Sequence, residues 1–178
     1  MALYNQSNTQ LGRVVKSSST SLQGFEGLGV VLVNNGGYGS VALPTNVNQR
    51  PYGVITDGSV TDIEVLQQQG LDWGPAGCYG VGVLPQSSDR NARFYLYGTC
   101  NPGDLLVWAP IGTVVSILLP QNFTSTGTNV TLTVTTGMVQ SLATAGAGTF
   151  GVIGQAEEAG TQGQLVLVRP YVGLQVTQ

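Results

Sequence analysis

The chain has 178 residues, of which only 8% are charged, a formal net charge of −3 and no histidine. With Lys16 as its one lysine, it cannot assemble the basic surface that phosphate binding needs, which argues against nucleic-acid binding. The absence of histidine removes the commonest general base and the commonest metal ligand. Ordinary globular proteins carry about 25% charged residues. The scarcity here indicates that partners or symmetry mates cover much of the surface.

Residues 1–24 are polar and show neither a helical nor a strand period, so we expect a flexible N-terminal arm. Two interpretations stay open. The arm is a frayed terminus, or it orders on a partner's surface with Tyr4, Leu11, Val14 and Val15 as anchors. No basic and apolar leader begins the chain, and no apolar run approaches the roughly 18 residues that a bilayer span needs. We therefore expect neither export nor membrane insertion.

From residue 25 onward the chain has β character. Runs of β-branched and aromatic residues predict strands in the first half, separated by turns of Asn, Gly and Pro. These strands are expected at residues 29–33, 41–43, 50–55 and 63–65. Residues 70–82 hold five glycines and a proline, which predicts a loop or a bulged strand.

The second half continues in the same way. Strands are expected at residues 94–97, 105–108, 114–119, 130–135, 150–153 and 165–168. The strands around residues 116–136 and the polar segment between them have no counterpart in the first half. We interpret them as an inserted β-hairpin that protrudes from the domain.

One short element occurs twice. Gly53, Val54 and Ile55 recur as Gly151, Val152 and Ile153, 98 residues later, and Gly39 and Val41 recur as Gly137 and Val139 at the same offset. The repeat predicts two related halves, because two copies are too few for a solenoid. The six residues of the repeated Gly-Val-Ile element are expected to form a structural core. Residues 149–172 are expected to form a strand, a turn and a strand, with Leu165 and Leu167 also in the core.

Few residues suggest chemistry. The G-x-G-x-x-G match at residues 146–151 leads into a strand, whereas a dinucleotide site needs a helix there. The adjacent acids Glu157 and Glu158 are expected to be solvated turn charges, although a carboxylate pair such as Asp89 with Asp104 stays open. Cys78 and Cys100 are expected to be free thiols, mostly buried. We therefore expect no catalytic residues, no cofactor site and no metal site.

The order of motifs carries a resemblance. The second half contains GDLLV at residues 103–107, VQSLA at 139–143, FGVIGQA at 150–156 and AGTQGQLVLV at 159–168. The first half shows a similar succession at residues 39–43, 50–55 and 63–65. In this succession, which covers about half of the chain, the sequence resembles the capsid decoration, or cement, proteins of tailed bacteriophages. The arm, the loop around Trp73 and the hairpin depart from the pattern.

The resemblance implies a structural virion protein without catalytic activity. It would bind the outer surface of the capsid, contact the major capsid protein, and self-associate, as a homotrimer more readily than as a homodimer. Candidate capsid-contact residues are Tyr4, Leu11, Arg13, Val14 and Lys16. No nucleic acid or membrane partner is expected, and the protein would be made in the host cytoplasm. The alternatives are another virion β protein, such as a head fibre, spike or tail component, and a carbohydrate-active enzyme.

Together these observations predict an all-β fold. We expect a small β-barrel-like or β-sandwich-like domain of two related halves over residues 25–178, with the polar arm over residues 1–24 and the inserted hairpin over residues 116–136.

Overall fold

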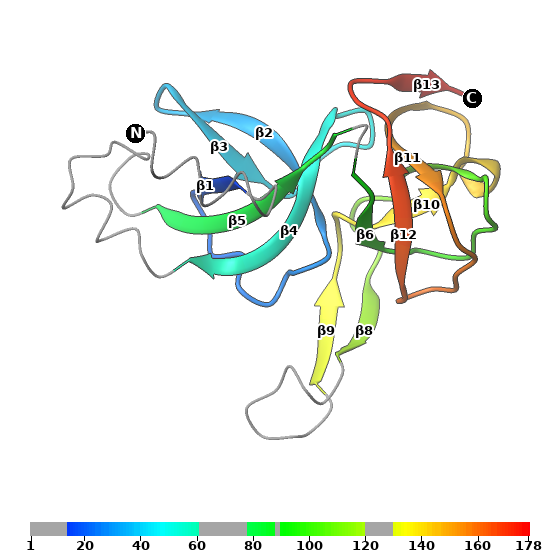
Figure 1. Ribbon diagram of the computed structural model, residues 1–178, viewed down its shortest axis with the longest axis horizontal. Helices are drawn as coiled ribbons and strands as arrows, with labels where there is room; N and C mark the ends of the chain where they lie inside the picture. Colours follow the sequence, from blue (N-terminus) through cyan, green and yellow to red (C-terminus); the bar gives the residue numbers. More distant parts are fainter. Residues whose placement is uncertain (1–13, 61–77, 88–89, 120–129) are drawn as a thin grey trace.

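The computed structural model describes residues 14–60, 78–87, 90–119 and 130–178, and these residues form a nearly all-β structure (Figure 1). The first half contains β1 (Val14–Ser18), β2 (Gly29–Asn35), β3 (Tyr38–Ala42), β4 (Pro51–Val60) and β5 (Tyr79–Pro85). The second half contains β6 (Ala92–Tyr95), β7 (Leu105–Trp108), β8 (Val115–Leu119), β9 (Val130–Val134), β10 (Val139–Ser141), the 3-10 turn η2 (Leu142–Thr144), β11 (Thr149–Ala156), β12 (Leu165–Pro170) and β13 (Gln175–Thr177). The predicted all-β class is confirmed.

The first half is one antiparallel sheet in the order β1-β5-β4-β2-β3. The sheet curls until its two edge strands meet, where the hydroxyls of Ser17 on β1 and Ser40 on β3 form a buried hydrogen bond of 2.6 Å. The predicted turn between β2 and β3 is present. Its glycines, Gly36 and Gly37, have φ values of 61° and 91°, which residues other than glycine rarely adopt.

The second half is an antiparallel sheet in the order β10-β7-β11-β12-β6, with β13 added beside β11. This sheet curls in the same way. A parallel bridge joins Leu96, just after β6, to Val139 on β10, and the N–H of Tyr97 donates to the carbonyl oxygen of Val139 at 2.7 Å. Each half is therefore a small, strongly curled sheet, here called a half-barrel, whose two edge strands contact each other.

The two half-barrels share one topology. Strands β1, β2, β3, β4 and β5 correspond to β6, β7, β10, β11 and β12, in chain order and in their positions across the sheet. The hairpin β8–β9 interrupts the second copy between its second and third strands. It begins at Val115, one residue before the insertion predicted over residues 116–136. Figure 1 shows the two halves side by side and the hairpin extending away from both.

The strand register corrects the predicted residue correspondence. Gly39 and Val41 do correspond to Gly137 and Val139 at the predicted offset. In the next strand, however, Gly53 corresponds to Gly154 and not to Gly151. Each lies opposite a proline, Pro85 and Pro170 respectively, and beside an equivalent register shift.

The match at Gly151 fails because Gly154 lies 15 residues after Val139, whereas Gly53 lies 12 residues after Val41. The residues of the repeated element nevertheless lie in the interior, as expected: Gly53 and Gly151 are buried, and so are Val54, Ile55, Val152 and Ile153.

The prediction of a flexible arm over residues 1–24 is wrong from Val14 onward. Residues 14–18 form β1, which pairs with β5 along its whole length. Ser17, Ser18 and Leu22 are buried. The meeting of β1 with β3 supplies a partner for the hydroxyl of Ser17, and a local sequence pattern cannot show this. Residues 1–13 lie outside the described residues.

The glycine-rich segment over residues 70–82 was predicted as a loop or a bulged strand. From Tyr79 it is strand β5, whose register with β4 is irregular, and residues 70–77 lie outside the described residues. One further expectation needs correction. On β12 the buried residues are Val166, Val168 and Pro170, whereas Leu165 is 39% exposed. A run that is apolar throughout does not show which alternate residues face inward. The strand predicted at residues 63–65 lies outside the described residues.

The halves pack as one unit. One buried cluster joins Val30 and Ile55 of the first half to Ile117 and Val134 of the second. The connection between β3 and β4 also reaches across, because Trp108 Nε1 donates to the carbonyl oxygen of Gln49 at 2.7 Å. A backbone hydrogen bond of 2.8 Å from Gly151 to Val47 lies beside it.

Candidate interaction surface

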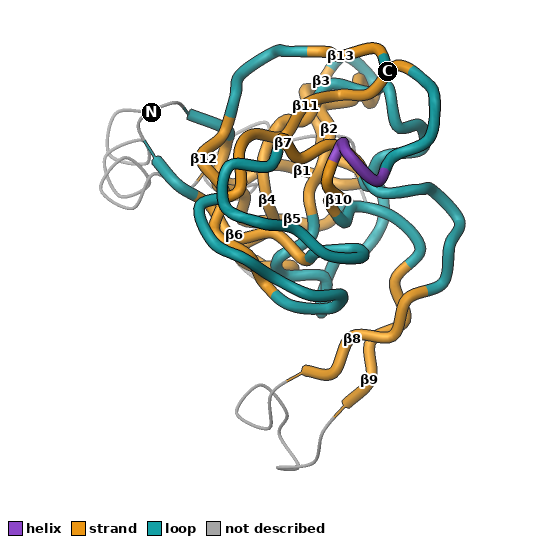
Figure 2. The backbone as a smooth tube through the Cα atoms, turned by 90° about the vertical axis from the view of Figure 1, so that its right-hand side faces the viewer, coloured by secondary structure: helices purple, strands orange, loops and turns teal. Residues whose placement is uncertain are grey.

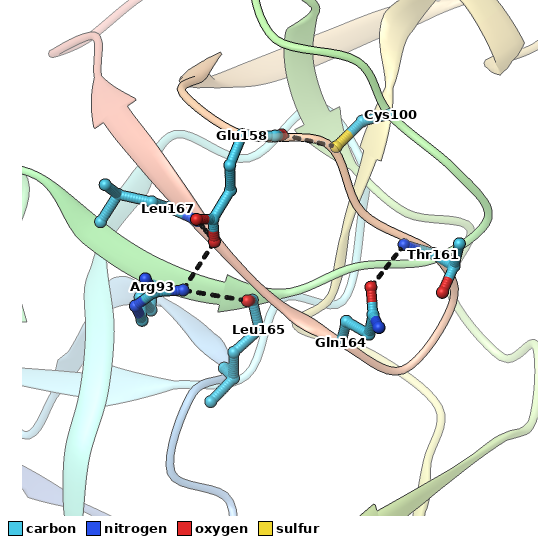
Figure 3. Close-up of polar contacts among 7 residues, drawn as sticks. All are labelled: Arg93, Cys100, Glu158, Thr161, Gln164, Leu165 and Leu167. Carbon is cyan, nitrogen blue, oxygen red and sulfur yellow. Dashed lines mark hydrogen bonds and ion pairs between the residues drawn. The ribbon is translucent and has the colours of Figure 1, made fainter.

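The acidic residues of the β11–β12 turn belong to a structural network, and Figure 3 shows the contacts of Glu158. The carboxylate of Glu158 accepts hydrogen bonds from the backbone N–H of Leu167 at 2.9 Å and from Arg93 at 2.6 Å. These two hydrogen bonds, the backbone one first, lower the pKa of Glu158. Glu157 pairs with Arg169 at 2.8 Å. Both acids were expected to be solvated turn charges, but each is bound to an arginine across the sheet.

The two cysteines are free, as expected. Cys100 is buried, and its thiol donates to the carbonyl oxygen of Glu158 at 3.6 Å. Burial, followed by the nearby charge of Asp104, raises the pKa of the Cys100 thiol, which disfavours the nucleophilic thiolate. Cys78 is half-buried and contacts the side-chain amide of Asn35. The charged groups that act on the Cys100 thiol, Asp104 and Glu158, are both acidic, so they do not activate it.

Metal ligands do not gather anywhere in the part of the chain that the structure describes: no three Cys, Asp or Glu residues lie together. Of the open carboxylate pair, Asp104 closes a turn by accepting the N–H of Asn101 at 2.9 Å, and Asp89 lies outside the described residues. Over the same described ranges, no helix has the length and apolar character needed to cross a membrane.

Only two of the five candidate capsid-contact residues lie in the part of the chain that the structure describes. Tyr4, Leu11 and Arg13 lie outside it. Val14 and Lys16 lie on β1, opposite Val83 and Val81 of β5. Val14 packs against the core, so burial accounts for it without a partner. Lys16 is half-buried, and its ammonium lies over the ring of Tyr52, 5.6 Å from the centroid.

Lys16 belongs to a small mixed surface where the first half-barrel opens. A Cβ placed on Gly39 would lie 3.9 Å from the Lys16 ammonium and 3.7 Å from Leu32 Cδ1. Leu32 is 51% exposed. A shallow hollow of about 220 Å³ adjoins it, lined by Leu32, Val33, Asn34, Gly37, Tyr38 and Gly39. We call Lys16, Leu32, Gly39 and Tyr52 the β1–β3 surface. It joins the Lys16 ammonium to an exposed leucine and to the half-buried ring of Tyr52, and aromatic residues are enriched at protein contacts.

A second surface surrounds the hairpin. Residues 105–156 contain no charged residue at all, and they include both hairpin strands. Ile111 and Val114, just before β8, are exposed by 36% and 65%. Figure 2 shows β8 and β9 leaving the body of the molecule. We call β8, β9, Ile111 and Val114 the hairpin surface.

Sequence reasoning found one part of these surfaces and missed another. The hairpin was predicted, and a count of charges along the chain would also have shown the uncharged run. By contrast, Leu32 lies on a strand predicted only as apolar, and Tyr52 is distant from Lys16 in sequence. Their meeting depends on the curling of the first sheet.

Comparisons with protein-family models, with curated proteins and with solved structures find no match to this chain. The geometry of the two surfaces and the motif resemblance therefore carry the functional argument.

Proposed function

We propose that this protein is a structural virion protein that binds the outer surface of a bacteriophage capsid and stabilises contacts between neighbouring major capsid subunits. The proposed role is non-catalytic. The partners would be the major capsid protein and further copies of the chain itself, for which the resemblance favours a homotrimer over a homodimer.

One observation carries the proposal. The two half-barrels share a buried core and so form a single body. This body presents two separate surfaces: the β1–β3 surface on the first half, with Lys16 as its one charge, and the uncharged hairpin surface on the second. A protein that holds neighbouring subunits together needs at least two contact sites held at a fixed spacing. Weak contacts then suffice, because binding at one site raises the effective concentration at the other.

The first test is to mix the purified protein with expanded, undecorated phage shells. We expect co-sedimentation with the shells and a rise in the melting temperature of the shells, because a ligand that binds only the assembled state stabilises it. Absence of both effects would refute the proposal.

Substitutions locate the contact. Leu32→Asp places a charge in the β1–β3 surface and is expected to weaken shell binding about 10-fold or more, the effect of losing an interface anchor. Leu174→Asp is a matched control, because Leu174 is also 51% exposed but lies on the segment before β13. Equal binding by the two variants would remove the β1–β3 surface from the proposal.

The projecting hairpin favours one alternative, a head fibre, spike or tail component of a virion. Copy number separates the two functions. A decoration protein is expected in hundreds of copies per particle, and a spike or tail component in few. Quantitative mass spectrometry of purified particles measures this ratio directly.

A further inference from the structure

Strand β9 has a sequence that is the same in both directions. Its five residues are Val130, Thr131, Leu132, Thr133 and Val134. When two copies of such a strand pair antiparallel about a two-fold axis, each position meets its own residue type. Leu132 lies opposite Leu132, valine lies opposite valine, and Thr133 of one copy lies opposite Thr131 of the other. A palindromic strand is therefore suited to an isologous contact.

The outer edge of β9 is open to such a contact. Among the described strands, β9 pairs with β8 alone. The outer side of β8 lies close to the body of the protein, since a Cβ placed on Gly163 would lie 3.9 Å from the carbonyl oxygen of Ser116. The backbone edge of β9 thus faces away from β8 without a strand partner in the described structure.

The devices that usually protect an edge strand are missing from β9. Natural edges carry lysine, proline, a bulge or an inward-pointing charge. Strand β9 has no charged residue and no proline, and its register with β8 is regular from Val115–Val134 to Leu119–Val130. An uncharged edge of regular register favours pairing with another strand.

The alternation of the hairpin fits the same arrangement. Val115 and Val134 are cross-strand partners and are buried in the core, as is Ile117. Ser116 and Thr133 are the next pair, and both are exposed. A two-fold axis perpendicular to the sheet keeps paired positions on the same face. The apolar positions of both copies would thus stay on one side and the polar positions on the other.

We propose that two copies of this chain associate by antiparallel pairing of β9, about a two-fold axis through Leu132, to form a four-stranded sheet in the order β8-β9-β9-β8. A two-stranded hairpin is marginally stable alone, whereas larger sheets are stable. The contact lacks charges, so its strength should change little with salt. It does not depend on capsid binding, and it favours a dimer over the trimer that the resemblance implies.

The test uses complementary charges at the threonine positions of β9 in the full chain. The lysine variant carries Thr131→Lys and Thr133→Lys, and the glutamate variant carries Thr131→Glu and Thr133→Glu. Either variant alone would place two pairs of like charges across the contact. We therefore expect the dissociation constant of its dimer to be at least about 10-fold higher than that of the wild-type dimer. Mixing the two variants converts these pairs into opposite charges, so a mixed dimer is expected to form.

Sedimentation equilibrium at several concentrations measures the dimerisation of the lysine variant, of the glutamate variant and of their mixture. A matched control carries Thr149→Lys and Thr177→Lys, an exposed cross-strand pair on β11 and β13 whose hydroxyls lie 3.0 Å apart. Figures 1 and 2 place β13 at the opposite end of the molecule from the hairpin. The control should dimerise like the wild type.

A wild-type chain that stays monomeric or forms a trimer overturns the proposal. Two charged variants that fail to combine although both remain folded by circular dichroism also overturn it, as does dissociation of the control. Shell binding can succeed or fail independently, since it is measured in a separate experiment.

Discussion

At the scale of single residues, the contacts of Glu158 explain its lowered pKa. Its carboxylate accepts a hydrogen bond from the backbone of β12 and binds Arg93 on β6, so it joins two strands of the second sheet. Both contacts are stronger with the ionised form. The pKa of Glu158 is therefore lower in the folded chain than the ordinary glutamate value of 4.5.

This shift gives a prediction with a definite sign. A folded-state pKa below the unfolded value contributes stability above pH 4.5, and that contribution is lost as the pH falls through the lowered pKa. The Glu158→Gln variant lacks it. We expect the wild type to be more stable than the variant at pH 7 and the difference to shrink towards pH 3, as measured by urea unfolding. A difference independent of pH would contradict the assignment.

Residue-scale errors in the sequence analysis have a common origin. Leu165 and Leu167 were expected in the core, yet Val166 and Val168 fill it. All four are apolar, so neither choice has a local advantage. The neighbouring strand decides, because β6 pairs Val166 with the buried Phe94. Which alternate residues of such a strand face the core depends on contacts with residues that are distant in sequence.

At the scale of elements, the duplicated half-barrel assigns matching roles to two glycines. A Cβ on Gly53 would collide with the backbone of β5 at Leu84 and Pro85, and a Cβ on Gly154 would collide with the backbone of β12 at Arg169 and Pro170. Backbone atoms cannot move aside as a flexible side chain does. Both positions need glycine for the close approach of two strands.

We therefore expect Gly53→Ala and Gly154→Ala to lower the free energy of unfolding by similar amounts, about 1–3 kcal/mol each, as overpacking does. Gly146→Ala is the control, because a Cβ there would meet nothing within 4 Å. Guanidinium unfolding measures all three. A neutral Gly154→Ala would contradict this correspondence. Gly151→Ala is no test of it, because a Cβ on Gly151 would collide with the backbone carbonyl of Gln49 in any case.

The elements themselves were largely predictable. Most strands lie where β-branched and aromatic residues gather, and the hairpin was found as an insertion because it lacks a counterpart. Strand β1 was missed, since its serines are buried only through the meeting of β1 with β3. The exposed part of the β1–β3 surface was missed for the same reason, because Leu32 and Tyr52 approach Lys16 only after the sheet has curled.

At the scale of the whole molecule, the two half-barrels do not have separate cores. Val31 and Val54 of the first half pack in one buried cluster with Phe94, Leu106 and Trp108 of the second. The hydrogen bond from Trp108 to Gln49 ties the connection between β3 and β4 to the same cluster. Unfolding one half would expose apolar surface and buried polar groups of the other.

We therefore expect a single cooperative thermal transition rather than two. Differential scanning calorimetry should give equal calorimetric and van't Hoff enthalpies per cooperative unit, the mark of two-state unfolding. Two resolved transitions, or a folded fragment of residues 90–178 alone, would show that the halves are independent domains.

The insertion between β7 and β10 has a consequence for engineering. In the first half-barrel, the equivalent connection is the turn at Gly36 and Gly37 between β2 and β3, whereas in the second it spans residues 109–138. The same scaffold therefore accepts either a minimal turn or an entire extra hairpin at one junction. The β2–β3 turn is thus a natural graft point, where a foreign peptide can be displayed without disturbing the strands that flank it.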